Sequence, residues 1–240
     1  PGWRIATAGS LLPVSLAREA RLRLTTDVWI IYGATESSIN AVGLAADLED
    51  FPGQVGVNPG GAILEILDDA GRQVPEGQPG EIRVKSERMS SAYIDDPEGT
   101  AERFKDGWFY TRDVGRRLAD GVPGAGRLIL EGRADDRMNL GGMKFMPSVL
   151  EEAAFACPGV RDAAAFAAPD AAGLDQCWLA VAADPDFDRE SLAPHLARYP
   201  NLPPPRFAWV EKIPRNAMGK VERTRLRAAL IAATRGNPDV

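Results

Sequence analysis

The sequence predicts a mixed α/β chain made of two parts that differ in their residue patterning. The first part opens with a strand–helix–strand unit and continues in short alternating runs, which are typical of an antiparallel sheet or partial barrel. The second part has interleaved helical and strand patterns that predict a small α/β domain. We therefore expect two domains, residues 1–133 and residues 134–240, and a chain of 240 residues is long enough for both.

The strand–helix–strand unit opens the chain. Residues 4–8 and 27–32 are apolar runs of strand length, and residues 13–24 between them have the periodicity of an amphipathic helix opened by Pro13. After about Gly53, alternating runs predict further strands at Ala62–Leu67, Glu81–Lys85 and Arg127–Leu130. The Asp68-Asp69 pair is interpreted as a hairpin turn, because the later ligands that a calcium loop requires are missing.

The second part has alternating helices and strands. Helices are predicted at residues 148–156, 189–198 and 221–233, and strands at residues 163–167, 178–182 and 207–210. The single histidine, His195, lies in a polar helix without a neighbouring ligand, so we expect a surface role for it. Three arginines of the last helix are interpreted as its solvated face: Arg223, Arg225 and Arg227.

Composition argues against several kinds of partner. The formal net charge is −6 and the pI is about 5.0, whereas a nucleic-acid-binding face needs clustered lysine and arginine. No apolar run approaches the roughly 18 residues of a membrane span, and the start lacks the pattern of a signal peptide, so we expect a cytoplasmic protein. Cys157 and Cys177 lack metal-ligand spacing and are expected to be small buried side chains.

Four short motifs follow one another along the chain. They are Tyr32-Gly33-Ala34-Thr35-Glu36, Tyr110-Thr111-Arg112-Asp113, the segment from Gly132 to Glu152, and the segment from Pro214 to Arg223. The last contains Gly219-Lys220, a compact ammonium group on a backbone that glycine leaves mobile, which suits contact with a phosphate. Taken alone, Lys220 is an ordinary solvated loop lysine, and only the ordered set of motifs favours a function for it.

This ordered set resembles the adenylate-forming superfamily, which includes acyl-CoA synthetases, peptide-synthetase adenylation domains and luciferases. The first motif is similar to the family's Tyr-Gly-x-Thr-Glu element, the second to its ribose-binding Tyr-x-Thr-Gly-Asp element, and the third to its hinge segment. The resemblance implies that residues 1–133 are the end of the large AMP-binding domain. Residues 134–240 would be the mobile C-terminal domain.

The resemblance implies a role for each motif residue. Lys220 would contact the substrate carboxylate and the phosphate or ribose oxygens during adenylation. Asp113 would accept hydrogen bonds from both ribose hydroxyls, since two carboxylate oxygens match a vicinal diol, and Arg133 would donate near the same sugar. Thr35 would donate to the α-phosphate, and Glu36 would hold magnesium through a hard oxygen.

The remaining motif residues would complete the nucleotide and acceptor sites. Tyr32 would lie against the adenine ring, with Gly33 beside it in the nucleotide-binding element. Asp135 would be the pivot at which the small domain swings between adenylation and thioester formation. The implied CoA-binding residues are Gly141 and Gly142, for the close approach of pantetheine, and Lys144, for a CoA phosphate.

Two departures from the family pattern matter. Arg112 occupies a position where glycine is common, which puts the local backbone geometry, rather than Asp113 itself, in question. The sequence also contains no Ser/Thr/Gly-rich loop ending in Pro-Lys-Gly, whose backbone N–H groups cradle the ATP phosphates in the family. With a start at Pro1-Gly2, this leads us to expect the C-terminal portion of a longer enzyme, completed by a missing N-terminal segment.

The resulting hypothesis is an AMP-forming ligase of the acyl-CoA synthetase type. It would activate a small carboxylic acid with ATP and magnesium and transfer the acyl group to CoA. The hinge form Asp-Asp-x-x-Asn-x-Gly-Gly-x-Lys favours CoA, because peptide-synthetase domains usually carry a Lys-x-Arg-Gly version. Two alternatives stay open, an adenylation domain that loads a carrier protein and a non-catalytic fragment that binds adenylate.

Overall fold

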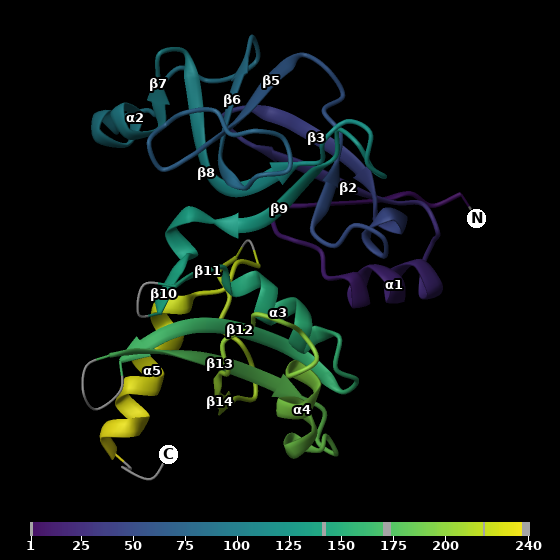
Figure 1. Cartoon of the computed structure of the whole chain (residues 1–240), viewed down its shortest axis with the longest axis vertical. Coiled ribbons are helices and arrows are strands. Elements are labelled where there is room, and N and C mark those ends of the chain that lie inside the picture. Colours follow the sequence, from purple (N-terminus) through teal and green to yellow (C-terminus); the bar gives the residue numbers. More distant parts are fainter. Residues whose placement is uncertain (1, 141–142, 170–173, 218, 237–240) are drawn as a thin grey trace. The chain divides into compact units, whose positions relative to one another are not determined.

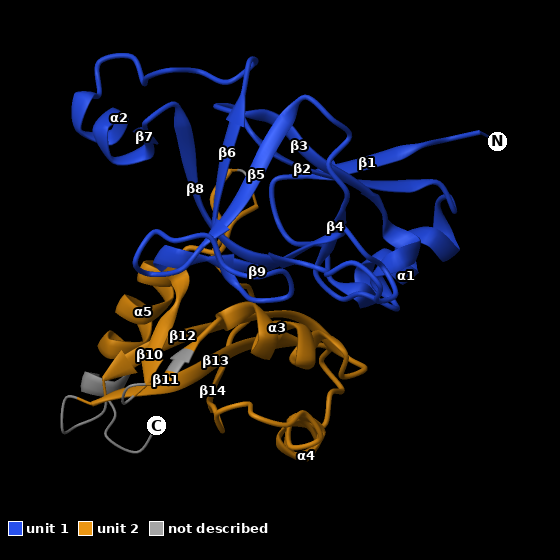
Figure 2. Ribbon diagram, turned by 45° about the horizontal axis from the view of Figure 1, so that its top comes forward, with its two compact units in different colours: residues 1–135 blue, residues 136–240 orange. Residues whose placement is uncertain are grey.

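The computed structural model describes residues 2–140, 143–169, 174–217 and 219–236, with side chains for all of these except residues 144 and 233–236. The chain divides into two compact units, unit 1 from Pro1 to Asp135 and unit 2 from Asp136 to Val240 (Figure 2). The division falls two residues after the boundary predicted from the sequence. Both units mix helices with sheets, so the predicted α/β class is confirmed.

Unit 1 begins with the predicted strand–helix–strand unit. Its first elements are β1 (Ile5–Ala8), α1 (Val14–Arg23), β2 (Val28–Ala34) and β3 (Ser38–Leu44) (Figure 1). These strands form a sheet in the order β1-β2-β3, in which β1 and β2 run parallel and β2 and β3 antiparallel. Strand β3 was not predicted, and it turns the parallel pair into a mixed sheet.

The rest of unit 1 is the predicted antiparallel sheet, which has six strands in the order β4-β9-β8-β6-β5, with β7 beside β8. The strands are β4 (Gln54–Gly56), β5 (Ala62–Leu67), β6 (Gly80–Ser86), β7 (Phe104–Lys105), β8 (Trp108–Arg117) and β9 (Leu128–Arg133). Asp68 after β5 accepts hydrogen bonds from the backbone N–H groups of Ala70 and Arg72, as a turn residue does. Val28 and Ile30 of β2 share one buried cluster with Ile82 of β6, so both sheets have a common core.

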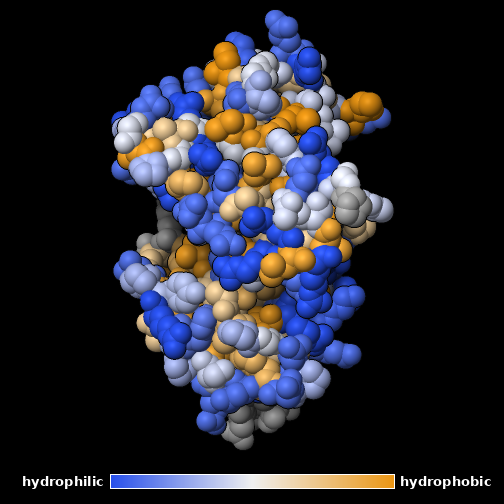
Figure 3. Space-filling view, turned by 90° about the vertical axis from the view of Figure 1, so that its right-hand side faces the viewer, coloured by the Kyte–Doolittle hydropathy of each residue, from blue (hydrophilic) through white to orange (hydrophobic). Residues whose placement is uncertain are grey.

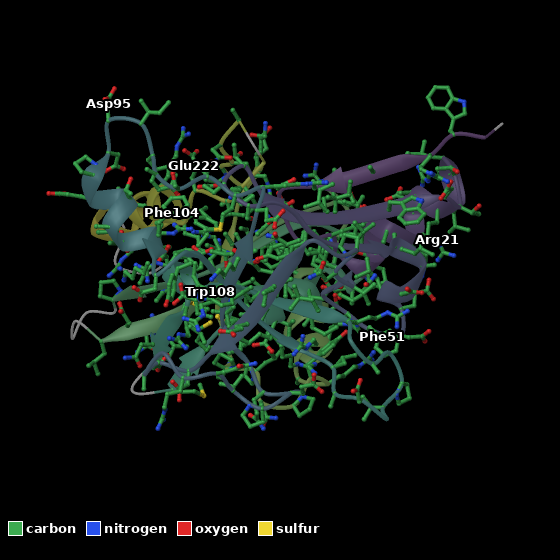
Figure 4. The ribbon with its side chains drawn as sticks, turned by 90° about the horizontal axis from the view of Figure 1, so that it is seen from above. Arg21, Phe51, Asp95, Phe104, Trp108 and Glu222 are labelled. Atoms are coloured by element: carbon green, nitrogen blue, oxygen red, sulfur yellow. The ribbon has the colours of Figure 1, made fainter. Side chains whose placement is uncertain are left out.

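A short helix in unit 1 was not predicted. Helix α2 (Pro97–Arg103) starts with proline, whose missing N–H costs nothing in the first turn. The Asp96 carboxylate accepts a hydrogen bond from the backbone N–H of Gly99 and caps this helix. Asp95, in the loop that leads into α2, points its side chain away from the protein (Figure 4). The helix lies between β6 and the β7–β8 pair, and β8 carries the second motif.

Unit 2 is a three-stranded sheet covered by helices on both faces. Its elements are β10 (Met138–Leu140), β11 (Met143–Phe145), α3 (Pro147–Phe155), β12 (Val160–Pro169), β13 (Asp175–Ala183), α4 (Leu192–Leu196), β14 (Arg206–Trp209) and α5 (Arg223–Gly236). The main sheet has the order β12-β13-β14, and β10 and β11 pair separately as a hairpin. Three-residue 3-10 turns precede β10, at Ala134–Asp136, and α4, at Arg189–Ser191.

Alternation along β12 separates the two faces of unit 2. Ala163 and Ala165 belong to the buried cluster that includes Leu150 of α3, whereas Ala164 packs in a second cluster with Leu226 of α5. His195 of α4 is half-buried, and its Nε2 lies 3.0 Å from the carbonyl oxygen of Ala153. This histidine therefore joins two helices, which is a structural rather than a purely surface role.

Large exposed apolar side chains are concentrated in unit 1. They include Trp3, Leu22 and Leu24 near α1, which are 73%, 80% and 69% exposed. Figure 3 shows such orange residues interspersed among polar ones on one face of the molecule. In unit 2, Cys157 and Cys177 are both buried and unpaired, as predicted. No described helix is both long and apolar enough to cross a membrane.

Candidate active site

The first motif forms the tight turn between β2 and β3. Ala34 pairs with Ser38 across the hairpin, and Ser38 has a φ of +64°, which closes the turn in the left-handed region. A Cβ atom added at Gly33 would lie 2.1 Å from the carbonyl oxygen of Ser38, so only glycine fits at this position. The turn leaves Thr35 exposed and Glu36 half-buried at its tip.

A buried hydrogen bond supports this turn from beneath. The amide of Asn40, in β3, donates to the hydroxyl of Ser37 at 2.9 Å, and both side chains are buried. The backbone N–H of Ser37 also donates to the carbonyl of Ala34 at 3.2 Å. Because buried polar groups are held by such bonds, the turn is fixed before any substrate binds. This turn carries Thr35, the candidate for phosphate contact, and Glu36, the candidate for metal binding.

Glu36 is held by a tyrosine that sequence analysis did not identify. The hydroxyl of Tyr93 donates to Glu36 Oε1 at 2.6 Å, and the N–H of Ser90 donates to the Glu36 carbonyl at 2.7 Å. Burial, followed by the bond to Glu36, raises the pKa of Tyr93 to about 12, so the hydroxyl remains a donor at neutral pH. The ring of Tyr93 packs edge-on against Phe104, with centroids 5.3 Å apart.

Asp113 of the second motif is where separate elements of unit 1 meet. It lies opposite Arg133 in the antiparallel pairing of β8 with β9, and Arg133 Nη1 is 3.4 Å from Asp113 Oδ1. The hydroxyl of Tyr32, from β2, donates to Asp113 Oδ2 at 2.9 Å. Burial raises the pKa of Tyr32 well above its ordinary value, and the nearby negative charge of Asp113 adds to this effect.

Tyr32 is only 7% exposed, so in this structure its visible role is to hold Asp113. Its predicted position against the adenine ring stays a prediction. Of the residues implied by the resemblance, Tyr32, Asp113 and Arg133 are brought into direct contact, and Thr35 and Glu36 follow on the same hairpin as Tyr32.

The backbone that carries Asp113 is fixed by buried polar contacts. Thr111 is 2% exposed, and its hydroxyl donates to the carbonyl of Ile82 at 2.8 Å while accepting from the N–H of Asp113 at 3.0 Å. Arg103, the last residue of α2, donates to the carbonyls of Tyr110 and Thr111 at 2.6 and 2.9 Å. These bonds set the direction in which the Asp113 side chain leaves β8.

Arg112 adopts the backbone conformation that a glycine would favour. Its φ is +61°, within the left-handed region where a side chain costs roughly 1–2 kcal/mol. Its guanidinium forms an ion pair with Glu102 of α2. The departure from the family's glycine is therefore accommodated by strain at Arg112, and the neighbouring Asp113 keeps its contacts.

In unit 2, Lys220 lies in a closed loop. An isolated bridge pairs Arg215 with Val221, and the backbone N–H of Asn216 donates to the Lys220 carbonyl at 2.9 Å. Gly219 has a φ of +79°, which the turn requires and glycine allows. The Lys220 side chain is exposed, and no carboxylate of the described residues forms an ion pair with it.

The interpretation of Arg223 as part of a solvated helix face was wrong. Its side chain is 20% exposed, and its Nη2 donates to Glu151 Oε1 at 2.6 Å. Arg225, two residues later, is 74% exposed, as the interpretation expected. Helical periodicity did not find the contact of Arg223, because the partner lies 72 residues away.

The third motif crosses the division between the units. Asp135 is 60% exposed, and its Oδ2 lies 3.6 Å from Arg133 Nη2. Lys144 pairs with Asn139 in the β10–β11 hairpin, but its side chain lies outside the described structure, as do Gly141 and Gly142 entirely. The roles implied for these CoA-binding residues and for the pivot at Asp135 stay predictions.

Comparison with known proteins supports the family assignment. The family model described as AMP-binding enzyme matches residues 1–94. The sulfoacetate–CoA ligase of Cupriavidus necator is 31% identical over 231 residues, which cover 92% of this chain and 43% of the ligase.

Solved structures agree. The amide bond synthetase McbA from Marinactinospora thermotolerans has a TM-score of 0.84 at 28% identity, covering 94% of this chain and 47% of that one. The anthranilate CoA ligase AuaEII, solved with anthranoyl-AMP, has a TM-score of 0.83 at 26% identity, covering 95% of this chain and 45% of that one. This chain thus spans less than half the length of each of these proteins, and it is similar to members of the adenylate-forming, AMP-binding superfamily, CoA ligases among them.

Proposed function

We propose that this chain carries the ribose-binding and lysine-bearing parts of an ATP-dependent acid–thiol ligase. The observation that supports this most strongly is the meeting of Tyr32 and Asp113, which are 81 residues apart, with Arg133 on the other side of the same carboxylate. Such a carboxylate has a fixed orientation, and its two oxygens match the two hydroxyls of a ribose diol. Asp113 is therefore proposed as the ribose acceptor and Arg133 as a donor at the same sugar.

The adenylation step joins a carboxylate oxygen of the acid to the α-phosphorus of ATP and breaks the bond to pyrophosphate. The step crowds negative charge, so fixed donors aimed at the phosphate lower the barrier. We propose that the exposed hydroxyl of Thr35 donates to an α-phosphate oxygen. The Lys220 ammonium, described within unit 2, is proposed to neutralise charge on the acid and phosphate oxygens.

Magnesium, when bound, would offset the charge of the departing phosphates. Glu36 fits this ion, because a carboxylate offers the hard oxygen that magnesium prefers. The described residues include no group of three or more acidic, histidine or cysteine side chains that would hold a metal by themselves. A single carboxylate is in keeping with magnesium, which is usually bound through one or two carboxylates together with substrate phosphates.

The second step transfers the acyl group to a thiol, and we propose CoA as the acceptor because of the hinge form Asp135-Asp136 followed by Asn139. Unit 1 is assigned to the large domain and unit 2 to the mobile domain, with rotation at Asp135 between the two steps. CoA and ATP as substrates favour a cytoplasmic location. Similarity to an amide bond synthetase keeps an amine acceptor as an alternative.

The test is carboxylate-dependent exchange of pyrophosphate into ATP, over a panel of aliphatic and aromatic acids. Exchange with one class of acid supports adenylation and names the substrate class. The acceptor is then tested with CoA, a pantetheinylated carrier protein and an amine in parallel. An absence of exchange with every acid, in a protein shown to be folded, would support the alternative of a non-catalytic, adenylate-binding fragment.

A further inference from the structure

We propose that Arg223 is a positioning residue that couples the hinge to the loop of Lys220. It binds Asp136, the residue that follows the pivot Asp135, and it lies three residues beyond Lys220. The inference rests on the proposed roles of Asp135 and Lys220. The structural coupling itself, in which the Arg223 side chain links the turn of Asp136 to the Lys220 loop, can be tested without any measurement of catalysis.

The guanidinium of Arg223 contacts three separate elements of unit 2. Its Nη1 lies 3.3 Å from Oδ2 of Asp136, in the short 3-10 turn at the beginning of the unit. Its Nη2 donates to Oε1 of Glu151, in α3, and its Nε donates to the carbonyl of Ala165, in β12, at 3.0 Å. The rigid fork of arginine suits three directed bonds, whereas lysine has a single flexible ammonium.

Two of these contacts belong to a closed ring of hydrogen bonds among Arg223, Glu151 and Ala165. Glu151 Oε1 accepts from Arg223 and also from the backbone N–H of Ala165 at 2.9 Å, while the Ala165 carbonyl accepts from Arg223. Burial raises the pKa of Glu151, and the charge of Arg223 opposes that shift. These bonds fix the Arg223 guanidinium against strand β12, and from this fixed position it also binds Asp136. We call the contact between Arg223 and Asp136 the hinge contact.

Arg223, fixed by its bonds to Glu151 and Ala165, holds the chain just after the Lys220 loop, and a second arginine, Arg215, holds the other end. Arg215 Nη2 and Nε bind the Asp162 carboxylate at 2.7 and 3.1 Å, and Arg215 Nη1 donates to the Gly219 carbonyl at 2.8 Å. The loop is therefore tied to β12 through Arg215 and, just beyond its end, through Arg223. A loop fixed in this way turns as one body with Asp136 when the backbone rotates at Asp135.

The hinge contact, between Arg223 and Asp136, can be removed without disturbing the core of unit 2. Asp136 is 34% exposed, whereas Glu151 is 15% exposed and belongs to the closed ring. Substitution Asp136→Asn removes the negative charge of the Asp136 side chain and leaves the bonds of Arg223 to Glu151 and Ala165 in place. Arg223→Lys is the second variant, because it keeps the charge but cannot make three directed bonds.

The experiment is amide hydrogen exchange of the purified protein, followed separately for residues 134–140, residues 215–222 and strand β13. We expect Asp136→Asn to speed exchange in the first two segments together, several-fold or more, with β13 unchanged. Arg225→Gln is the matched control, since Arg225 is exposed and, among the residues that the structure describes, its ion pair is with nearby Glu222. Arg223→Lys should speed exchange of the same two segments at least as much.

Faster exchange in 134–140 alone, or in neither segment, would overturn the coupling. As a second readout, the ratio of adenylation rate to thioester-forming rate should change in Asp136→Asn and stay unchanged in Arg225→Gln. If exchange shows the coupling while the wild-type protein catalyses neither step, the proposed function fails and the physical coupling stands. If wild type catalyses both steps but exchange shows no coupling, only this inference fails.

Discussion

The Tyr32 hydroxyl donates a hydrogen bond of 2.9 Å to Oδ2 of Asp113, joining strands from the two sheets of unit 1. Neither residue belongs to the other's sheet, and no local pattern in the sequence signals that they meet. The bond explains why a carboxylate at this position keeps one orientation. It also makes the orientation of Asp113 depend on a residue of a different motif.

Tyr32→Phe removes this bond while keeping the ring. We expect the unfolding free energy to fall by about 1–3 kcal/mol, because a half-buried carboxylate loses a donor. The KM for ATP should rise more than kcat falls, since the variant loosens a binding group. Thermal unfolding and steady-state kinetics check this, with Tyr199→Phe, a partly exposed tyrosine of unit 2, as the control. Unchanged stability together with unchanged KM would contradict the role given to Tyr32.

Tyr93→Phe tests the support of Glu36. The ring contact with Phe104 is kept, and only the hydroxyl that donates to Glu36 is lost. Loss of a group that hydrogen-bonds to a metal-binding side chain commonly lowers metal affinity by about 10–100-fold. The magnesium concentration that gives half-maximal ATP–pyrophosphate exchange should therefore rise by roughly that factor. An unchanged magnesium dependence would show that Tyr93 does not orient Glu36 for the ion.

Arg112 offers a test of backbone strain. Replacement by glycine releases roughly 1–2 kcal/mol of left-handed strain. It also loses the ion pair with Glu102 and increases the conformational entropy of the unfolded chain. Because these effects oppose each other, the unfolding free energy should stay within about 1 kcal/mol of the wild-type value. Arg112→Val should destabilise clearly, because a β-branched residue tolerates a positive φ poorly. Chemical denaturation of both variants measures the difference. Equal effects of glycine and valine would refute the strain at this position.

Alkaline pH should weaken the fold through Tyr93 and Tyr32. The pKa of Tyr93 is raised from 10.0 to about 12, and the pKa of Tyr32 is also raised. A raised pKa means that the protonated form is favoured in the folded state, so this stabilisation is complete below pH 10 and is lost as pH rises toward 12. Tyr93→Phe should flatten that fall when unfolding is followed across this range. A variant whose stability falls as steeply as that of the wild type would contradict the role of the Tyr93 hydroxyl as a donor to Glu36.

The sequence predicted those elements that have a regular apolar period. The helix expected at 13–24 appears at Val14–Arg23, and the strand expected at 163–167 lies within Val160–Pro169. Strand β3 was missed because buried polar Asn40 and glycine interrupt its alternation. Helix α2 was missed because its seven residues include none that is buried, so no apolar face marks it.

The motifs were visible in the sequence, but their supporting contacts were not. Tyr93 lies 57 residues from Glu36, and Arg223 lies 87 residues from Asp136. Pairing across such distances depends on strand register, including the irregularity between Val114 and Gly115 in the β8–β9 pair, which periodicity does not reveal. Arg223 was placed on a solvated face because charged helix residues usually are solvated.

The proposed role of Lys220 in adenylation is tested by comparing three forms of the protein. Carboxylate-dependent ATP–pyrophosphate exchange is compared for wild type, Lys220→Ala and Lys212→Ala, an exposed lysine of the same unit. Loss of a charged donor to the transition state, about 2.7–4 kcal/mol, predicts exchange lowered by about 10²–10³-fold in Lys220→Ala. Thermal unfolding and the Lys212→Ala variant should both match wild type. Full exchange in folded Lys220→Ala would contradict the role proposed for Lys220.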